Sequence, residues 1–384
     1  MIAQSRMDIS LASPLLGGLS PQTFMRRHWQ KKPLLVRQAV PGGIDLVERS
    51  RLFEMAAHDE VESRVIVRRD KRWTLRQGPL PRSAMPPLKQ PNWTLLVQGL
   101  DLHLPAARTL LDRFRFVPDA RLDDAMLSFA TDGGGVGPHV DSYDVFLLQA
   151  KGKRRWRIGK VRDTELVPDV PLKILANFEP EQEWLLDAGD MLYLPPGWAH
   201  DGVAEGECMT CSIGFRAAGR DELAREVLQR LLDGADADSR GPLYRDPSLA
   251  ATDTPGRLPR DLQAFAEAAV ARLLAEPRAL ACALGEVLSE PKRGVWFDAV
   301  DDDARASLVA GGVQLDQRTR ALYDDAHVFI NGESFRASGR DAKLMRRLAD
   351  RRALGARDVA ALSPAARELL DEWLAAGWVR VQAP

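Results

Sequence analysis

The spacing of apolar residues changes twice along the chain, near residues 218 and 301, and these changes constrain the fold most. Up to residue 217 the apolar runs are short and are interrupted by Pro and Gly, as in residues 93–97 and 191–194. Short apolar runs bounded by turn residues are typical of a β sandwich or barrel. We therefore expect residues 1–217 to form a mainly β domain of the jelly-roll type.

Residues 218–300 have a helical pattern instead. Leu, Val and Phe recur every three or four residues in three segments, 223–232, 262–274 and 280–288. A helix with one apolar stripe must bury that stripe against another surface. We expect an α-helical region that forms either a helical subdomain or the interface of a homodimer.

The last region, residues 301–384, predicts a small winged helix. Asn331-Gly332 lies between two apolar runs and is a strong hairpin signal. Helical segments at 342–353 and 363–376 follow, and a strand at 378–381 closes the region. The region holds 13 acidic and 13 basic residues, and Glu368, Asp371 and Glu372 occupy the second helix. A helix that reads DNA needs Arg or Lys there, so we expect no DNA binding.

Composition excludes several classes of protein. The chain has 384 residues and a net charge of −1, which argues against bulk binding of nucleic acid or anionic membrane. No apolar run approaches the roughly 20 residues of a membrane span, and we expect a cytoplasmic protein without a signal peptide. Three cysteines cannot build a disulfide framework. Cys208 and Cys211 would face opposite sides of a strand, so they do not predict a metal site.

A metal site is predicted by one His-x-Asp pair and one distant histidine. His139 and Asp141 follow a glycine-rich run and would share one face of a strand. His200 comes 61 residues later, at the end of an apolar run and a Pro-Pro-Gly turn. Two histidines and one carboxylate form the facial triad of non-haem Fe(II) oxygenases, although Mn²⁺ could also bind there. We expect the glycines to let the backbone pass close to a bound substrate.

A basic residue is predicted inside the same domain. In residues 154–158, Arg154 shares a face with Trp156 and Ile158, whereas Arg155 and Arg157 point to the other face. A buried guanidinium needs an anionic partner, and its planar fork fits a carboxylate. Arg154 is therefore a candidate anchor for a cosubstrate, with a structural Arg–Asp pair as the alternative. We expect the other two arginines to be solvated.

At these residues the chain resembles the JmjC-type ribosomal oxygenases, in particular bacterial arginine hydroxylases of large-subunit ribosomal protein sixteen. The resemblance depends on Gly-Gly-Gly-Val-Gly-Pro-His-Val-Asp-Ser-Tyr-Asp-Val-Phe, on Arg154 fifteen residues after His139, and on Leu-Pro-Pro-Gly-Trp-Ala-His. It implies a cupin-like double-stranded β-helix (JmjC) domain at 1–217, a helical dimerisation region at 218–300 and a winged-helix domain at 301–384.

The resemblance also implies roles for single residues. The implied iron ligands are His139, Asp141 and His200. Arg154 would bind the distal carboxylate of 2-oxoglutarate, where many relatives have Lys, and Ser128 would help to hold the same cosubstrate.

For a substrate guanidinium, the candidates near the metal motif are Asp132, Tyr143 and Asp144, of which Asp132 is preferred. Asp132 also has a structural alternative, because Asp before Gly commonly starts a turn.

The activity implied in this way is hydroxylation of an arginine β-carbon in a ribosomal protein, with Fe(II), 2-oxoglutarate and O₂ consumed and succinate and CO₂ released. Two kinds of alternative stay open. One is another 2-oxoglutarate oxygenase, such as a histidine hydroxylase or lysyl demethylase. The other is a catalytically silent cupin-like scaffold that binds ribosomes.

Overall fold

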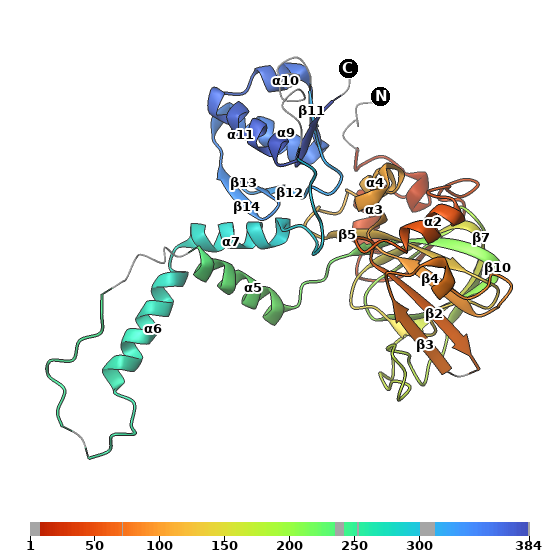
Figure 1. Ribbon diagram of the computed structural model, residues 1–384, viewed down its shortest axis with the longest axis horizontal. Coiled ribbons are helices and arrows are strands. Elements are labelled where there is room, and N and C mark those ends of the chain that lie inside the picture. Colours follow the sequence, from red (N-terminus) through yellow and green to blue (C-terminus); the bar gives the residue numbers. More distant parts are fainter. Residues whose placement is uncertain (1–7, 71, 235–241, 252, 300–311, 383–384) are drawn as a thin grey trace. The chain divides into compact units, whose positions relative to one another are not determined.

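The computed structural model describes residues 8–70, 72–234, 242–251, 253–299 and 312–382 (Figure 1). The chain divides into two compact units, Met1–Ala217 and Ala218–Pro384. In the described parts of both units, every helix is too short or too polar to cross a lipid bilayer.

The first unit is mainly β. Its strands are β1 (Leu34–Val36), β2 (Ser63–Arg69), β3 (Arg72–Gln77), β4 (Trp93–Val97), β5 (Leu122–Ala130), β6 (His139–Val140), β7 (Val145–Lys160), β8 (Gln182–Leu186), β9 (Met191–Leu194) and β10 (Trp198–Phe215). Its helices are η1 (Pro14–Leu16), α1 (Pro21–Arg27), α2 (Arg49–Met55), η2 (Arg82–Ala84), α3 (Leu100–His103) and α4 (Pro105–Asp112).

The strands form an antiparallel sheet in the order β1-β9-β7-β10-β5-β4-β2-β3, to which β6 and β8 add short branches. The two long strands belong to both layers: β7 pairs with β9 in its first half and with β8 in its second half. Strand β10 pairs first with β6 and later with β5. Both strands contain a glycine with positive φ near the middle, Gly152 at 65° and Gly206 at 72°. Glycine and an irregular register let a strand bend from one layer into the next, and the expected jelly roll is confirmed.

The two faces of β7 contact different clusters. Phe146 and Leu148 belong to the main hydrophobic cluster, together with residues of α1, α2 and α4. Val145 and Leu147 belong to a smaller cluster on the inner face, which also contains Trp156. The main cluster therefore attaches the helices to the outside of the β domain, and the inner face is left for the site.

The second unit contains helices and short strands. Its helices are α5 (Arg220–Asp233), α6 (Arg260–Leu274), α7 (Pro277–Ser289), α9 (Gly339–Arg351), α10 (Ala356–Ala360) and α11 (Pro364–Ala375). Its strands are β11 (Val313–Leu315), β12 (Ala321–Tyr323), β13 (His327–Ile330), β14 (Glu333–Arg336), β15 (Ala353–Leu354) and β16 (Val379–Val381).

The predicted hairpin and the helices around it are confirmed. Strands β13 and β14 pair across Asn331 and Gly332, whose φ angles are 49° and 89°. Positive φ at both central residues is what a type I′ turn requires, and Asn-Gly supplies it. Helices α9 and α11 cover the predicted segments, and β16 is the predicted closing strand. Helix α10 was not expected, because its single turn is too short to give a periodic pattern.

Helix α7 packs against the winged-helix strands. A Cβ at Gly285 would lie 2.4 Å from the Phe329 ring, so only glycine permits this close approach. The Ser334 hydroxyl donates to Oε1 of Glu286 at 2.6 Å. Helix α5 packs on α7, whereas α6 buries none of its residues and leaves Val270 58% exposed.

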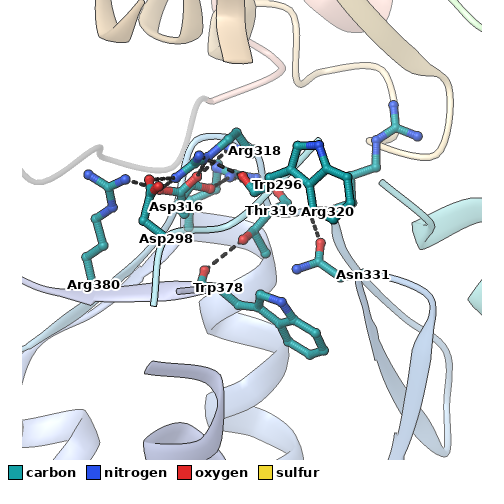
Figure 2. Close-up of polar contacts among 10 residues, drawn as sticks. Trp296, Asp298, Asp316, Arg318, Thr319, Arg320, Asn331, Trp378 and Arg380 are labelled. Atoms are coloured by element: carbon teal, nitrogen blue, oxygen red, sulfur yellow. Dashed lines mark hydrogen bonds and ion pairs between the residues drawn. The ribbon is translucent and has the colours of Figure 1, made fainter. Parts of the chain in front are cut away.

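A buried carboxylate organises the base of the winged helix (Figure 2). Asp316 accepts hydrogen bonds from Nε and the backbone N–H of Arg318 at 2.8 and 2.9 Å, and it forms an ion pair with Arg380. Arg318 also donates to Asp298 and to the carbonyl of Trp296. Asp316 thus connects the segment before β11 to the strands of the domain.

Candidate metal centre

Strand pairing brings the two predicted histidines together. Strand β6 is only two residues long, and its His139 lies directly opposite His200 of β10. The centres of the two imidazole rings are 4.2 Å apart. Asp141 follows β6, and its Oδ2 lies 3.7 Å from Nε2 of His200. One ligand atom from each of the three residues lies within 4.8 Å of the others.

Backbone carbonyls orient both imidazoles. Nδ1 of His139 lies 2.8 Å from the carbonyl oxygen of Gly137, and Nδ1 of His200 lies 3.2 Å from that of Trp198. A carbonyl only accepts hydrogen bonds, so each Nδ1 carries the proton and each Nε2 keeps its lone pair. Burial and the neighbouring His139 lower the pKa of His200 to about 4. His200 is therefore neutral near pH 7, which is the form that binds a metal.

This donor set fits an oxygenase metal. Two imidazole nitrogens and one carboxylate suit Fe(II), and they accept Mn²⁺ as well. His200 is buried, whereas His139 and Asp141 are only half-buried, so one side of the cluster is closed and the other is accessible. A metal with three protein ligands on one side keeps positions for small molecules on the other side.

Arg154 is buried on the same inner face, as predicted. It is 4% exposed and lies across the β7–β10 pair from Ala204. Its guanidinium contacts the Trp156 ring and the Cys208 thiol, at 5.8 Å from the ring centre and 3.7 Å from Sγ. Its Nε has no hydrogen-bond partner, and no described carboxylate forms an ion pair with it. The alternative of a structural Arg–Asp pair is therefore not found among the described residues.

Small side chains surround this guanidinium. Ala130, Ala204 and Cys208 form a separate buried cluster. Cys208 and Cys211 face different clusters, as expected, and burial raises the pKa of the Cys211 thiol. Cys208 is the member of this cluster that contacts the Arg154 guanidinium.

On the outer face of β7, the arginines form ion pairs with acidic side chains. Arg155 pairs with Glu183 and Glu205 at the surface, as the prediction of a solvated residue requires. Arg157 pairs with Asp201, whose carboxylate is buried. Arg157 is therefore only partly a solvated surface residue.

Ser128 is buried on β5, and its hydroxyl donates to the carbonyl of Thr210 at 3.2 Å. Thr94 of β4 was not singled out from the sequence. Its hydroxyl is fully buried without a hydrogen-bond partner, and the residue pairs with Ala130 on the neighbouring strand. A lone Thr within the apolar run of residues 93–97 was the signal that could have identified it.

Tyr143 lies beside Asp141. Burial, and then the charges of Asp141 and Asp124, raise the pKa of Tyr143, whose hydroxyl hydrogen-bonds to Asp141. The side chain is 39% exposed, so it reaches the accessible side of the cluster. Asp124 is buried and accepts a hydrogen bond from the backbone N–H of Gly99. Sequence reasoning missed Asp124, although it lies four residues before Ser128 and so on the same face of β5.

The other acidic candidates have structural contacts. Oδ1 of Asp132 accepts from the backbone N–H of Gly206 at 2.8 Å, in the bend of β10 six residues beyond His200. This contact favours the turn role that was the alternative for Asp132. Asp144 is fully buried and accepts hydrogen bonds from the Tyr193 hydroxyl and the Gln30 side chain.

The glycine run packs against the protein itself. A Cβ at Gly134 would lie 2.4 Å from the carbonyl oxygen of Trp93, and one at Gly135 would lie 2.3 Å from that of Gly202. These two glycines therefore permit close contact between backbones. The sequence attributed that closeness to a bound substrate, and the structure corrects this part of the interpretation.

Two family models match the chain. A JmjC domain matches residues 109–223, and a ROXA-like winged helix matches residues 272–380. The first match includes both candidate histidines and Asp141, and the second includes α7.

Curated proteins and solved structures are similar over most of the length. The ribosomal protein uL16 3-hydroxylase of Escherichia coli (strain K12) is 37% identical over 276 residues, 70% of this chain and 71% of that protein. A probable ribosomal oxygenase of Haemophilus influenzae is 35% identical, over 68% of this chain and 63% of the relative. The structure of the E. coli ribosomal oxygenase YcfD with cobalt and 2-oxoglutarate has a TM-score of 0.79 at 30% identity, covering 95% of this chain and 99% of the other. The chain belongs to the JmjC-type ribosomal oxygenases.

Proposed function

We propose that this protein is an Fe(II)- and 2-oxoglutarate-dependent hydroxylase that hydroxylates the β-carbon of an arginine in ribosomal protein uL16 and releases succinate and CO₂. One observation carries the proposal: a cluster of two histidines and one aspartate shares the inner face of the β domain with a buried arginine that has no anionic partner among the residues that the structure describes. The E. coli relative is a uL16 3-hydroxylase.

His139, Asp141 and His200 are the proposed iron ligands. The carbonyls of Gly137 and Trp198 hold the Nδ1 protons and so direct both Nε2 atoms to the metal. Bound Fe(II) supplies the activation of O₂, coupled to decarboxylation of 2-oxoglutarate. The protein contributes the orientation of the reactants and the exclusion of water.

Arg154 is the proposed partner of the distal carboxylate of 2-oxoglutarate. Its fork can donate two parallel hydrogen bonds, and the low exposure of the site strengthens them. The hydroxyl groups of Ser128 and Thr94, both buried, are the proposed neutral partners. Ala130 and Ala204 leave the space that the cosubstrate fills.

Tyr143 and Asp124 are the proposed contacts of the substrate arginine. A guanidinium is recognised by an aromatic face and by carboxylates. Tyr143 provides an aromatic ring, and the carboxylates of Asp141 and Asp124 lie near enough to raise its pKa. Asp132 stays a prediction from the motif alone, since its carboxylate holds the bend of β10.

The domains have proposed roles as well. We keep the division into a JmjC domain at 1–217, a dimerisation region at 218–300 and a winged-helix domain at 301–384. The exposed apolar side chains of α6, among them Phe265 and Val270, favour a homodimer. A cytoplasmic location follows from the proposed ribosomal substrate.

The test is mass spectrometry of uL16 incubated with the purified protein, Fe(II), 2-oxoglutarate and O₂. We expect uL16 to gain one oxygen atom on an arginine, with succinate formed in parallel. His139→Ala should abolish both products, and Arg155→Gln, on the outer face of β7, should retain them.

Other results identify the alternatives. Oxygen on a histidine, or loss of a lysine methyl group, would indicate another 2-oxoglutarate oxygenase. Ribosome association without turnover, unchanged in Asp141→Ala, would indicate a scaffold. Comparing the masses of ribosomal proteins from cells with and without the gene extends the same test to the natural substrate.

A further inference from the structure

The exposed face of α9 carries a row of basic side chains. Arg340, Lys343, Arg347 and Arg351 are spaced three or four residues apart, so they form one stripe along the helix, about 16 Å long. We call these four residues the basic stripe. The opposite face, with Met345 and Ala349, is buried in the winged-helix core, and Leu344 and Leu348 are buried along one flank of the stripe.

Acidic groups compensate little of this charge. Asp341 accepts hydrogen bonds from the backbone N–H and hydroxyl of Ser363, and Asp350 accepts from the Tyr323 hydroxyl. These are the two acidic residues of α9, and both are engaged outside the stripe.

Within the described part of the chain, one member of the stripe has an ion-pair partner: Arg347 pairs with Asp358 of α10 at 2.6 Å. Arg340, Lys343 and Arg351 are exposed and have no ion-pair partner among the described residues. The stripe therefore presents three positive charges without an ion-pair partner among the described residues, two before Arg347 and one after it.

Of the stripe, only Arg351 lies in the last turn of α9, where the helix dipole favours a cation. Like charges three or four residues apart repel each other. Arg340 lies in the first turn of α9, where the helix dipole disfavours a cation. A bound polyanion would offset both effects, so charge complementarity points to a negatively charged partner.

The neighbouring surface selects the type of polyanion. A helix that binds a membrane surface adds large apolar residues to its basic ones, whereas the large apolar residues of α9 are buried. Helix α11, where a winged helix would read DNA, carries Glu368, Asp371 and Glu372. The partner must therefore be held through phosphates without base reading.

We propose that the basic stripe of α9 binds the phosphate backbone of RNA. The choice of RNA rests on the proposed function, because an enzyme that acts on a ribosomal protein meets that protein beside ribosomal RNA. The near-zero net charge of the region does not oppose this surface, since α9 carries five basic and two acidic residues, whereas α11 carries one basic and three acidic residues.

The test measures binding of the full-length protein to a fluorescent 20-nucleotide single-stranded RNA of mixed sequence, by anisotropy between 50 and 200 mM KCl. With four phosphate contacts we expect affinity to fall about 50-fold over this range. In the triple variant Arg340→Gln/Lys343→Gln/Arg351→Gln, one contact remains and the fall should be about threefold. The variant should also bind at least tenfold more weakly at 50 mM KCl.

A matched control removes the same number of charges elsewhere. Arg26, Arg27 and Lys32 are exposed in the first unit, and their triple Gln variant should bind RNA like the unmodified protein. Equal loss in both variants, or no binding by the unmodified protein, overturns the proposal. Tighter binding to phosphatidylserine vesicles, or to a DNA oligonucleotide of the same sequence, overturns the choice of RNA.

Hydroxylation of an isolated uL16 peptide separates this proposal from the proposed function. Because the peptide brings no RNA, the α9 variant should hydroxylate it at the normal rate. If RNA binding depends on the stripe but neither the unmodified protein nor the α9 variant hydroxylates the peptide, only the proposed function is contradicted. Hydroxylation without stripe-dependent RNA binding contradicts only the RNA surface.

Discussion

Replacing Arg154 with methionine should stabilise the ligand-free protein and abolish its stabilisation by 2-oxoglutarate. The guanidinium is 4% exposed, and its Nε has no hydrogen-bond partner. A buried polar group without a partner costs about 1–3 kcal/mol. The contact with the Trp156 ring returns about 0.5–1 kcal/mol of this. Arg154→Met should therefore raise the free energy of unfolding by about 1–2 kcal/mol.

The same substitution should weaken the binding of 2-oxoglutarate. Two hydrogen bonds from a guanidinium to a carboxylate contribute about 1.5–3 kcal/mol each. Losing both weakens binding by a factor of at least about 100. At a 2-oxoglutarate concentration 100-fold above its Kd, the unmodified protein gains about 2.7 kcal/mol of stability. The Arg154→Met protein should gain less than about 0.5 kcal/mol at the same concentration.

The assay is urea unfolding of metal-loaded protein under anaerobic conditions, followed by circular dichroism with and without 2-oxoglutarate. Arg155→Met is the control, because Arg155 forms only exposed ion pairs with Glu183 and Glu205. Its stability should change by less than about 1 kcal/mol, and its response to 2-oxoglutarate should persist. An Arg154→Met protein that is less stable without ligand and still stabilised by 2-oxoglutarate would refute the assigned role of this arginine.

Other residues lead to separate expectations. Asp141→Ala should remove stoichiometric Fe(II) or Mn²⁺ binding, measured by metal analysis after gel filtration, while the circular dichroism spectrum stays unchanged; full metal content would contradict its role as a ligand. Tyr143→Leu should raise the KM for uL16 about two- to fivefold and leave the KM for 2-oxoglutarate nearly unchanged, as expected for loss of the aromatic face that contacts the substrate guanidinium; equal changes in both KM values would argue against a substrate contact. Burial alone would raise the pKa of Asp316. The hydrogen bonds from Arg318 outweigh burial and hold this pKa below its usual value. The stabilisation by Asp316 is therefore complete above its unfolded pKa of about 4 and is lost as the pH falls through the lower folded value. Asp316→Asn should cost about 1–3 kcal/mol at pH 7, since Arg318 keeps its bond to Asp298 and Arg380 is 60% exposed, and it should weaken the pH dependence of urea unfolding between pH 5 and 2; a parallel pH profile would contradict this reasoning.

Local features of the sequence were sufficient for several elements. Asn331-Gly332 predicted its hairpin because a type I′ turn needs positive φ at two adjacent residues. The helical spacing predicted α5, α6, α7, α9 and α11 within a few residues at each end. The inward direction of Arg154 followed from strand alternation, which is a property of the backbone.

The sequence pattern could not predict which distant segments contact each other. Asp132 and Asp124 both precede His139, but the sequence analysis named Asp132 as a candidate and did not consider Asp124. The bend of β10 places Gly206 against Asp132, whereas the inner face of β5 places Asp124 near Tyr143. Register and bending depend on the packing of the whole sheet, so neither could be derived from spacing.

The sequence by itself determined which side chains have the chemistry for a metal and a carboxylate, and on which face of its strand each lies, because residue type and alternation are local. Only the tertiary structure decided that His139 faces His200 and that Arg154 has no carboxylate partner among the described residues. These facts depend on which strands and helices pack together, and that choice is made by the burial of the entire core.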